Sequence, residues 1–233
     1  TKMSGLRSEH VKEAANVVSQ YCDMVAIRAF ASLTDKEKDE AEIVLRSFAK
    51  YASVPIINME SATAHPLQAL ADAITIEEFK PNHKPKVVLS WAPHPKALPH
   101  AVGNSFTQMM KNMDADFVIA HPEGYALNPK ITERIECTTD QEKALEDADF
   151  VYTKNWCSYD FYGQILRTDD QWMITPEKMQ LTNSGKFMHC LPIRRNIVAA
   201  DGVLDSPNSL VIQQSQNRIY SAQAVLKQLL ENG

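Results

Sequence analysis

The stretch "KVVLSWAPHPKALPH", residues 86–100, decides how this chain is organised. Its first half contains "VVLSW", a short apolar run that is typical of a buried β-strand. The strand leads at once into "APHPKALPH", a loop with three prolines, two histidines and a lysine. Prolines keep such a loop stiff, while its other side chains offer hydrogen-bond donors. A metal site, an anion-binding loop and a rigid structural turn are the interpretations that the stretch leaves open.

Apolar runs of this kind alternate with helical patterns along the whole chain. Strands are also predicted in "DMVAIR" (23–28), "VPIINM" (54–59), "DFVIA" (116–120), "FVYTKNW" (150–156) and "KFMHCLP" (186–192). Helices are predicted over 8–20, 34–50, 65–79 and 217–230, and in the segment that ends at Met110. Two capping boxes, Thr34-x-x-Glu37 and Thr139-x-x-Glu142, mark helix starts. The alternation predicts an α/β protein with two doubly wound lobes, each built on a parallel sheet.

The polar linker near residues 80–86 is the best boundary between the two lobes. We expect one lobe over 1–80 and the other over 81–213. The C-terminal helix, 214–233, is expected to complete the first lobe.

Composition excludes several classes of function. The chain has 233 residues, a hydrophobic fraction of 44% and a net charge of −5 without a basic block, which argues against nucleic acid or an anionic membrane as partner. No apolar run approaches the roughly 20 residues that span a bilayer, and the N-terminus lacks a signal-peptide core. The four cysteines are scattered, so reduced thiols and a cytoplasmic location are expected.

Charged or hydrogen-bonding residues stand where strand after strand ends. They are Arg28, Glu60, His94, His121, Lys154 and His189. In open parallel sheets, ligands bind outside the carboxyl ends of the strands. We therefore expect these side chains to face a common crevice.

Two further motifs supply candidate binding groups. "AHPLQ" puts His65 and Gln68 at a helix start, where free N–H groups favour an anion or a carbonyl group. "HCLPIRRN" puts Cys190 and Arg195 after a strand. A thiolate nucleophile is one alternative, but adjacent strand residues point to opposite faces, so His189 is poorly placed to deprotonate Cys190. No histidine pair has metal-ligand spacing, and a metal-free anion site is the preferred interpretation.

Several of these motifs together resemble the aspartate/ornithine carbamoyltransferase superfamily. They are "VAIRAF", "HPLQ", "FMHCLP" and "NR" at 217–218. "NMESATAHPLQ", "WAPHPKALPHAVGNSF", "AHPEGY", "VYTKNW" and "CLPIRRN" are similar to the branch that acts on N-acylated ornithine. The resemblance runs in order along nearly the whole chain. It implies carbamoyl transfer from carbamoyl phosphate to N-succinyl-L-ornithine, giving N-succinyl-L-citrulline and phosphate in arginine biosynthesis, with N-acetylornithine or ornithine as alternative acceptors.

The resemblance also implies a role for each matching residue. The carbamoyl phosphate site would comprise Arg28, His65, Gln68, Cys190, Leu191 and Arg218, with His65, Cys190 and Arg218 as catalytic residues. The acylornithine site would comprise Glu60, His94, Lys96, Lys154, Cys190, Leu191 and Arg195. The Leu191 carbonyl would accept a hydrogen bond from the amine. No metal or other cofactor is implied, and the expected assembly is a homotrimer.

In the acylornithine branch the loop that matches residues 92–100 surrounds later chain, which makes a knotted fold. The resemblance therefore implies a knot in the second lobe, with His94 and Lys96 reaching the acyl group. The family's Ser-x-Arg-Thr-Arg phosphate loop has no counterpart in these 233 residues. We accordingly expect the N-terminal part of the family to be absent and the first lobe to be truncated. A non-catalytic module that binds anions or amino acids is the alternative from another class.

Overall fold

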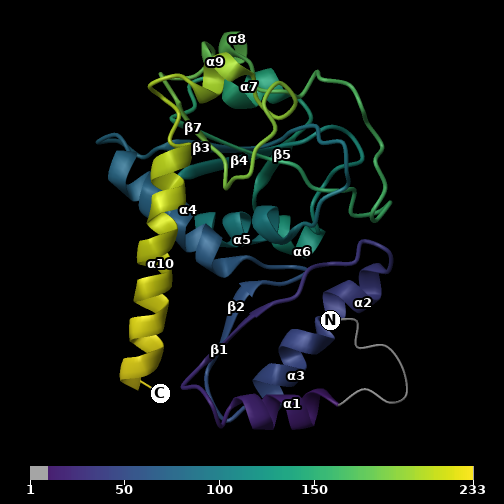
Figure 1. The fold of residues 1–233 in the computed structure, drawn as a ribbon. Helices are drawn as coiled ribbons and strands as arrows, with labels where there is room; N and C mark the ends of the chain where they lie inside the picture. Colours follow the sequence, from purple (N-terminus) through teal and green to yellow (C-terminus); the bar gives the residue numbers. More distant parts are fainter. Residues whose placement is uncertain (1–9, 233) are drawn as a thin grey trace.

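A computed structural model of the chain describes residues 10–232, which form two parallel sheets surrounded by helices (Figure 1). The strands of the small sheet are β1 (Val25–Arg28) and β2 (Ile56–Glu60). The large sheet has the order β5 (Glu136–Thr138), β4 (Asp116–Ala120), β3 (Lys86–Trp91), β6 (Phe150–Lys154), β7 (Lys186–Met188). All strand pairs are parallel, so the predicted α/β class is confirmed.

The helices follow the predicted alternation, with several additional short ones. They are α1 (Val11–Val18), α2 (Lys36–Ala41), α3 (Ile43–Tyr51), α4 (Pro66–Phe79), α5 (Ala101–Met110), α6 (Pro129–Thr132), α7 (Gln141–Leu145), α8 (Pro176–Met179), α9 (Asp201–Leu204) and α10 (Val211–Asn232). In Figure 1, α5 and α6 cover one face of the large sheet and α7, α8 and α9 the other. The predicted helix start at Ser8 lies outside the described residues.

Helix starts differ from the predicted capping boxes by one residue. Asp35 caps α2 by accepting a hydrogen bond from the Lys38 backbone N–H, and Asp140 caps α7 in the same way. The single helix predicted over 34–50 is wrong, because Glu42 adopts a left-handed backbone with φ 47° and separates α2 from α3. The last helix begins at Val211, six residues before the predicted start.

The strand order places a topological switch point at the centre of the large sheet. From β3 the chain first builds β4 and β5 on one side, and then returns to build β6 and β7 on the other. Trp91 and Lys154 are register partners, so the carboxyl ends of β3 and β6 are adjacent. Ligands of open α/β sheets bind in the crevice at such a point.

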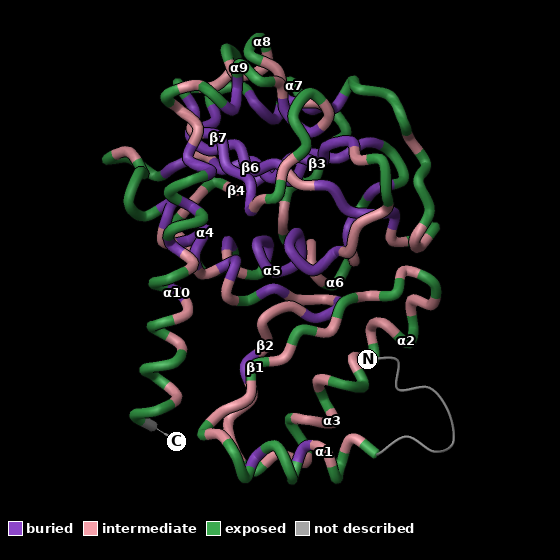
Figure 2. Tube along the Cα trace, viewed as in Figure 1, coloured by how far each residue is buried: buried purple, intermediate pink, exposed green. Residues whose placement is uncertain are grey.

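The hydrophobic core lies around the large sheet, as the continuous buried trace in Figure 2 shows. Val87, Val88 and Leu89 are fully buried, as expected for a parallel strand covered on both faces. The indole N–H of Trp91 donates to the Trp156 carbonyl at 2.8 Å, so the polar atom of this buried side chain is hydrogen-bonded. The core therefore fixes the strand ends from which the site is built.

The C-terminal helix α10 packs along α4. Buried amide side chains make the contact specific: Gln214 donates to Asp72 at 2.7 Å, and Asn217 donates to Thr75 at 3.0 Å. Across residues 10–232 no helix combines the length and the apolar character needed to cross a membrane.

Candidate functional site

Eight of the eleven predicted site residues line one cavity of about 230 Å³ at the carboxyl ends of both sheets. They are Arg28, Glu60, His65, Gln68, Lys154, Cys190, Leu191 and Arg218. Apolar residues that the sequence interpretation missed complete the lining: Phe30, Leu98, Pro99, Val102 and Pro192. The predicted residues are thus gathered from β1, β2, α4, β6, the segment after β7, and α10.

The small sheet supplies an ion pair at one side of the cavity. Arg28 and Glu60 are register partners at the ends of β1 and β2, and Arg28 Nη2 lies 2.7 Å from Glu60 Oε2. The Arg28 guanidinium also lies 4.6 Å from the centre of the Phe30 ring. The same Glu60 oxygen lies 3.6 Å from His65 Nε2. This carboxylate therefore pairs with Arg28 and lies beside His65.

His65 stands at the N-terminus of α4, where Pro66 begins the helix. The His65 backbone N–H donates to Ser105 Oγ at 2.7 Å, which fixes the helix start against α5. Its side chain is buried, and the ring Nδ1 has no hydrogen-bond partner. Burial, reinforced by the positive charges of Arg218, Arg28 and Lys154, lowers the pKa of His65 to about 4. The imidazole is neutral at neutral pH and can donate to a carbonyl oxygen or accept from a donor.

This shift of the His65 pKa predicts a pH dependence of stability. An unfolded histidine takes up a proton near pH 6.5, whereas folded His65 does so only near pH 4. The unfolded state therefore binds more protons in this window, and stability is lost as the pH falls from about 6.5 to 4. We expect His65→Gln to reduce this loss by roughly 3 kcal/mol, measured by urea unfolding at both pH values. A His65 NMR titration midpoint near 6.5 would contradict the prediction.

The segment after β7 forms the opposite wall. Leu191 has a left-handed backbone with φ 54°, and its N–H donates to His189 Nδ1 at 2.9 Å. The Leu191–Pro192 peptide bond is cis. Burial raises the pKa of the Cys190 thiol, so this sulfur is a neutral group and not a ready nucleophile. His189 Nδ1 is occupied by Leu191, which agrees with the expectation that His189 does not activate Cys190.

Three predicted acylornithine residues lie outside this cavity. His94 lines a neighbouring cavity of about 410 Å³ together with Pro93 and Pro95, and accepts from Arg194 Nε at 3.3 Å. Lys96 is exposed to solvent.

Arg195 is the clearest departure from the predicted site. Its guanidinium lies 2.9 Å from Asp201 and 2.7 Å from Asp205, in an exposed cluster. The sequence interpretation overlooked these carboxylates because they lie six and ten residues further along. The structure thus pairs Arg195 at the surface instead of directing it into the cavity.

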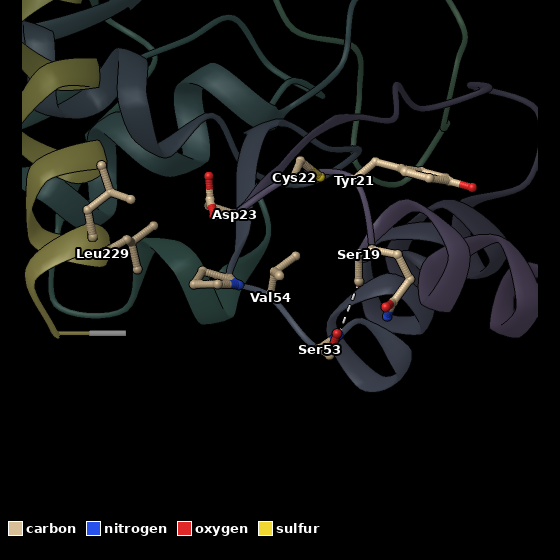
Figure 3. A pocket seen from close by; sticks show the side chains of 10 residues that line it. Ser19, Tyr21, Cys22, Asp23, Ser53, Val54 and Leu229 are labelled. Atoms are coloured by element: carbon tan, nitrogen blue, oxygen red, sulfur yellow. Dashed lines mark hydrogen bonds between the residues drawn. The ribbon is translucent and has the colours of Figure 1, made fainter.

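A larger cavity of about 620 Å³ lies at the amino ends of β1 and β2, next to the end of α10 (Figure 3). Its lining includes Ser19, Tyr21, Asp23, Ser53 and Leu229, but no lysine, arginine or histidine. Size alone therefore does not identify the site, since this larger cavity offers an anion no cationic side chain, whereas the cavity at the carboxyl ends is lined by Arg28, Lys154 and Arg218. Among residues 10–232, no three histidine, cysteine, aspartate or glutamate side chains are grouped to hold a metal ion.

Comparisons with known proteins agree with the residue pattern. The family model "Aspartate/ornithine carbamoyltransferase, carbamoyl-P binding domain" matches residues 1–78, and "Aspartate/ornithine carbamoyltransferase, Asp/Orn binding domain" matches 100–229. The chain is 50% identical to N-succinylornithine carbamoyltransferase of Bacteroides fragilis, over 99% of this chain and 73% of that protein. It is 38% identical to N-acetylornithine carbamoyltransferase of Xanthomonas campestris pv. campestris, over 99% of this chain and 74% of that protein.

Solved structures give the same result. A mutant of N-acetyl-L-ornithine transcarbamylase complexed with PALAO has a TM-score of 0.91 and 37% identity, over 98% of this chain and 75% of that one. Another mutant of that enzyme, complexed with carbamyl phosphate and N-succinyl-L-norvaline, has a TM-score of 0.90 with the same coverage.

Proposed function

This chain belongs to the aspartate/ornithine carbamoyltransferase family, and from that premise we propose that it carbamoylates the side-chain amine of N-succinyl-L-ornithine. The products would be N-succinyl-L-citrulline and phosphate, in arginine biosynthesis. The observation that carries the proposal is the cavity that combines Arg28, Arg218, His65, Gln68 and Lys154. This is the set of groups that a phosphate, a carbamoyl group and an anionic acceptor require.

In the proposed reaction the amine nitrogen attacks the carbamoyl carbon, the bond from that carbon to the phosphate oxygen breaks, and the proton that the amine loses leaves with the phosphate. Arg218 and Arg28 stabilise the phosphate that leaves. Neutral His65 donates to the carbamoyl oxygen, which gains negative charge. The Leu191 carbonyl accepts from the amine and orients it, and Cys190 packs beside the reacting atoms. Alignment of the two substrates supplies a large part of the rate enhancement.

The acceptor would extend from this cavity toward the proline-rich loop. Glu60 and Lys154 would hold its amino-acid end, while His94 and Lys96 would approach the acyl group. The higher identity to the succinylornithine relative supports the succinyl group over the acetyl group. Arg194, which contacts His94, adds a cation suited to a second carboxylate.

Three features of the architecture belong to the proposal. Carbamoyl phosphate would bind the lobe over 1–80, completed by the C-terminal helix, and the acylornithine would bind the lobe over 81–213. The loop 92–100 would encircle later chain as a knot, and Arg194 in that later chain contacts His94 in the loop. A cytoplasmic homotrimer is the expected assembly, and light scattering on the purified protein tests it.

A transfer assay tests the function. The purified chain is mixed with carbamoyl phosphate and one of three acceptors, and the ureido product is measured by colorimetry. We expect kcat/KM to fall in the order N-succinylornithine, N-acetylornithine, ornithine. A preference for ornithine would reject the acyl specificity. Binding of N-succinylornithine by calorimetry, without turnover of any acceptor, would instead favour a non-catalytic binding module.

A further inference from the structure

Asp72 is a fully buried carboxylate one helical turn beyond Gln68, and the proposed chemistry leaves it without a role. Its Oδ1 accepts two hydrogen bonds, one from Gln68 Nε2 and one from Gln214 Nε2, each at 2.7 Å. Burial raises the pKa of Asp72 to about 6, and these two donors oppose that rise. A carboxylate is rarely found fully buried unless it forms hydrogen bonds or ion pairs with neighbouring groups.

A backbone N–H determines which atom donates and which accepts in the hydrogen bonds around Asp72. The His189 N–H donates to Gln214 Oε1 at 2.8 Å, and a backbone N–H can only donate. Gln214 must therefore direct its Nε2 toward Asp72. Asp72 Oδ1 also accepts a hydrogen bond from Gln68 Nε2. This bond fixes which way the Gln68 amide points, whereas the amide of an isolated glutamine could point either way.

The consequence appears at the cavity. Gln68 is buried, lines the cavity, and has an Oε1 atom without a hydrogen-bond partner. With Nε2 directed to Asp72, Oε1 is the Gln68 atom that still needs a partner, and it can only accept a hydrogen bond. An N–H group of the ligand satisfies this oxygen, whereas a methyl group leaves it unpaired.

We propose that Asp72 is a positioning residue that fixes the Gln68 amide with its oxygen toward the cavity, and thereby selects a carbamoyl donor over an acetyl donor of the same shape. The inference rests on the proposed function, since it assigns the NH2 of carbamoyl phosphate to Gln68 Oε1. The segment that carries Cys190 and Leu191 would then be linked to Gln68 on the other side of the cavity. The link runs from the His189 N–H through Gln214 and Asp72.

The experiment compares dissociation constants for carbamoyl phosphate and acetyl phosphate by calorimetry. The wild-type protein should prefer carbamoyl phosphate. Asp72→Leu removes the acceptor and frees the Gln68 amide to rotate, so the preference should fall about tenfold. Asp72→Asn should retain the preference, because Gln214 still requires an acceptor and Asn Oδ1 supplies one, while its amide group faces the adjacent Tyr152 hydroxyl.

Thr75→Val is the matched control. Thr75 is equally buried on α4 and also takes a hydrogen bond from α10, but its hydroxyl donates to the Ala71 carbonyl and not to Gln68. Its loss should reduce stability without changing the ratio of the two dissociation constants. An unchanged ratio in Asp72→Leu, or an equal change in Thr75→Val, would overturn the positioning role.

The outcome separates this inference from the proposed function. Failure of the wild-type protein to bind either phosphate would overturn the proposed function, and the inference with it. If Asp72→Leu does not fold, the wild-type protein still provides a test by NMR. The side-chain amide protons of Gln68, assigned through their loss in Gln68→Met, should exchange slowly with solvent because Asp72 holds them. Rapid exchange would reject the inference.

Discussion

Arg218→Ala is expected to weaken carbamoyl phosphate binding by about 2–4 kcal/mol, or roughly 30- to 1,000-fold. Arg218 projects from α10 into the cavity, and within residues 10–232 no carboxylate forms an ion pair with it. Its charge is therefore available to a ligand without first breaking an existing pair. Its field already acts on the site, since it helps to lower the pKa of His65.

Calorimetric titration of the wild-type and variant proteins measures this effect. Arg218→Lys keeps the charge but loses the planar fork of donors, so an intermediate loss is expected. Arg195→Ala is the matched control, because this exposed arginine pairs with Asp201 and Asp205 outside the cavity. It should leave the affinity unchanged. Equal affinities of the wild-type protein and Arg218→Ala would remove Arg218 from the anion site.

Arg28 differs from Arg218 in what its removal would do to anion affinity. Half of its side chain is exposed, and it is already paired with Glu60. A bound anion must share this guanidinium with the carboxylate, which reduces the net gain from the contact. Removal of Arg28 also leaves Glu60 unpaired beside the phosphate. The affinity lost in Arg28→Ala would therefore combine a lost attraction with a new repulsion, whereas Arg218→Ala removes an attraction alone.

The residues at the strand ends could be predicted from sequence because two local signals coincide there. A short apolar run fixes where a parallel strand lies, and the first polar residue after it must reach the carboxyl edge of the sheet. Arg28, Glu60 and Lys154 follow this rule and line the cavity. His65 and Gln68 follow a second rule. Pro66 marks the start of a helix, and both side chains extend from that start into the cavity.

The features that sequence did not predict depend on contacts between distant segments. Arg195 appeared to be available until folding brought Asp201 and Asp205 to it. Leu98 and Val102 line the cavity because the proline-rich loop lies against the segment after β6, where the Cys157 N–H donates to the Leu98 carbonyl at 2.9 Å. The role of Asp72 required knowing that Gln214, 142 residues away, shares its oxygen. Local patterns carry none of this information.

Gly163→Ala should destabilise the folded protein by about 3 kcal/mol or more. Gly163 has φ +75°, a conformation that costs a residue with a Cβ about 1–2 kcal/mol. A Cβ atom there would also overlap the Leu33 carbonyl oxygen, a contact that real structures do not contain. The neighbour is backbone, so no side-chain rotation can relieve the clash.

The surroundings of Leu33 allow little movement. Its N–H donates to Asp39 Oδ2 at 2.9 Å, and the Tyr162 hydroxyl donates to the same oxygen at 2.9 Å. Any shift of the Leu33 carbonyl would disturb these hydrogen bonds, each of which costs about 1–3 kcal/mol when a partner is left unpaired. The contact joins the segment before α2 to the segment after β6, so the clash would loosen the packing between the small sheet and the large one.

Gly103→Ala is the matched control for this prediction. Gly103 lies within α5, where a Cβ would meet Leu127 and Trp156 at 3.5 Å, an ordinary contact distance. Alanine also favours the helix over glycine by about 1 kcal/mol. In urea unfolding, Gly103→Ala should therefore equal or exceed the wild-type stability, while Gly163→Ala falls well below it. Equal stabilities of the two variants would mean that the Leu33 backbone yields to a methyl group, and that Asp39 does not hold the two segments together.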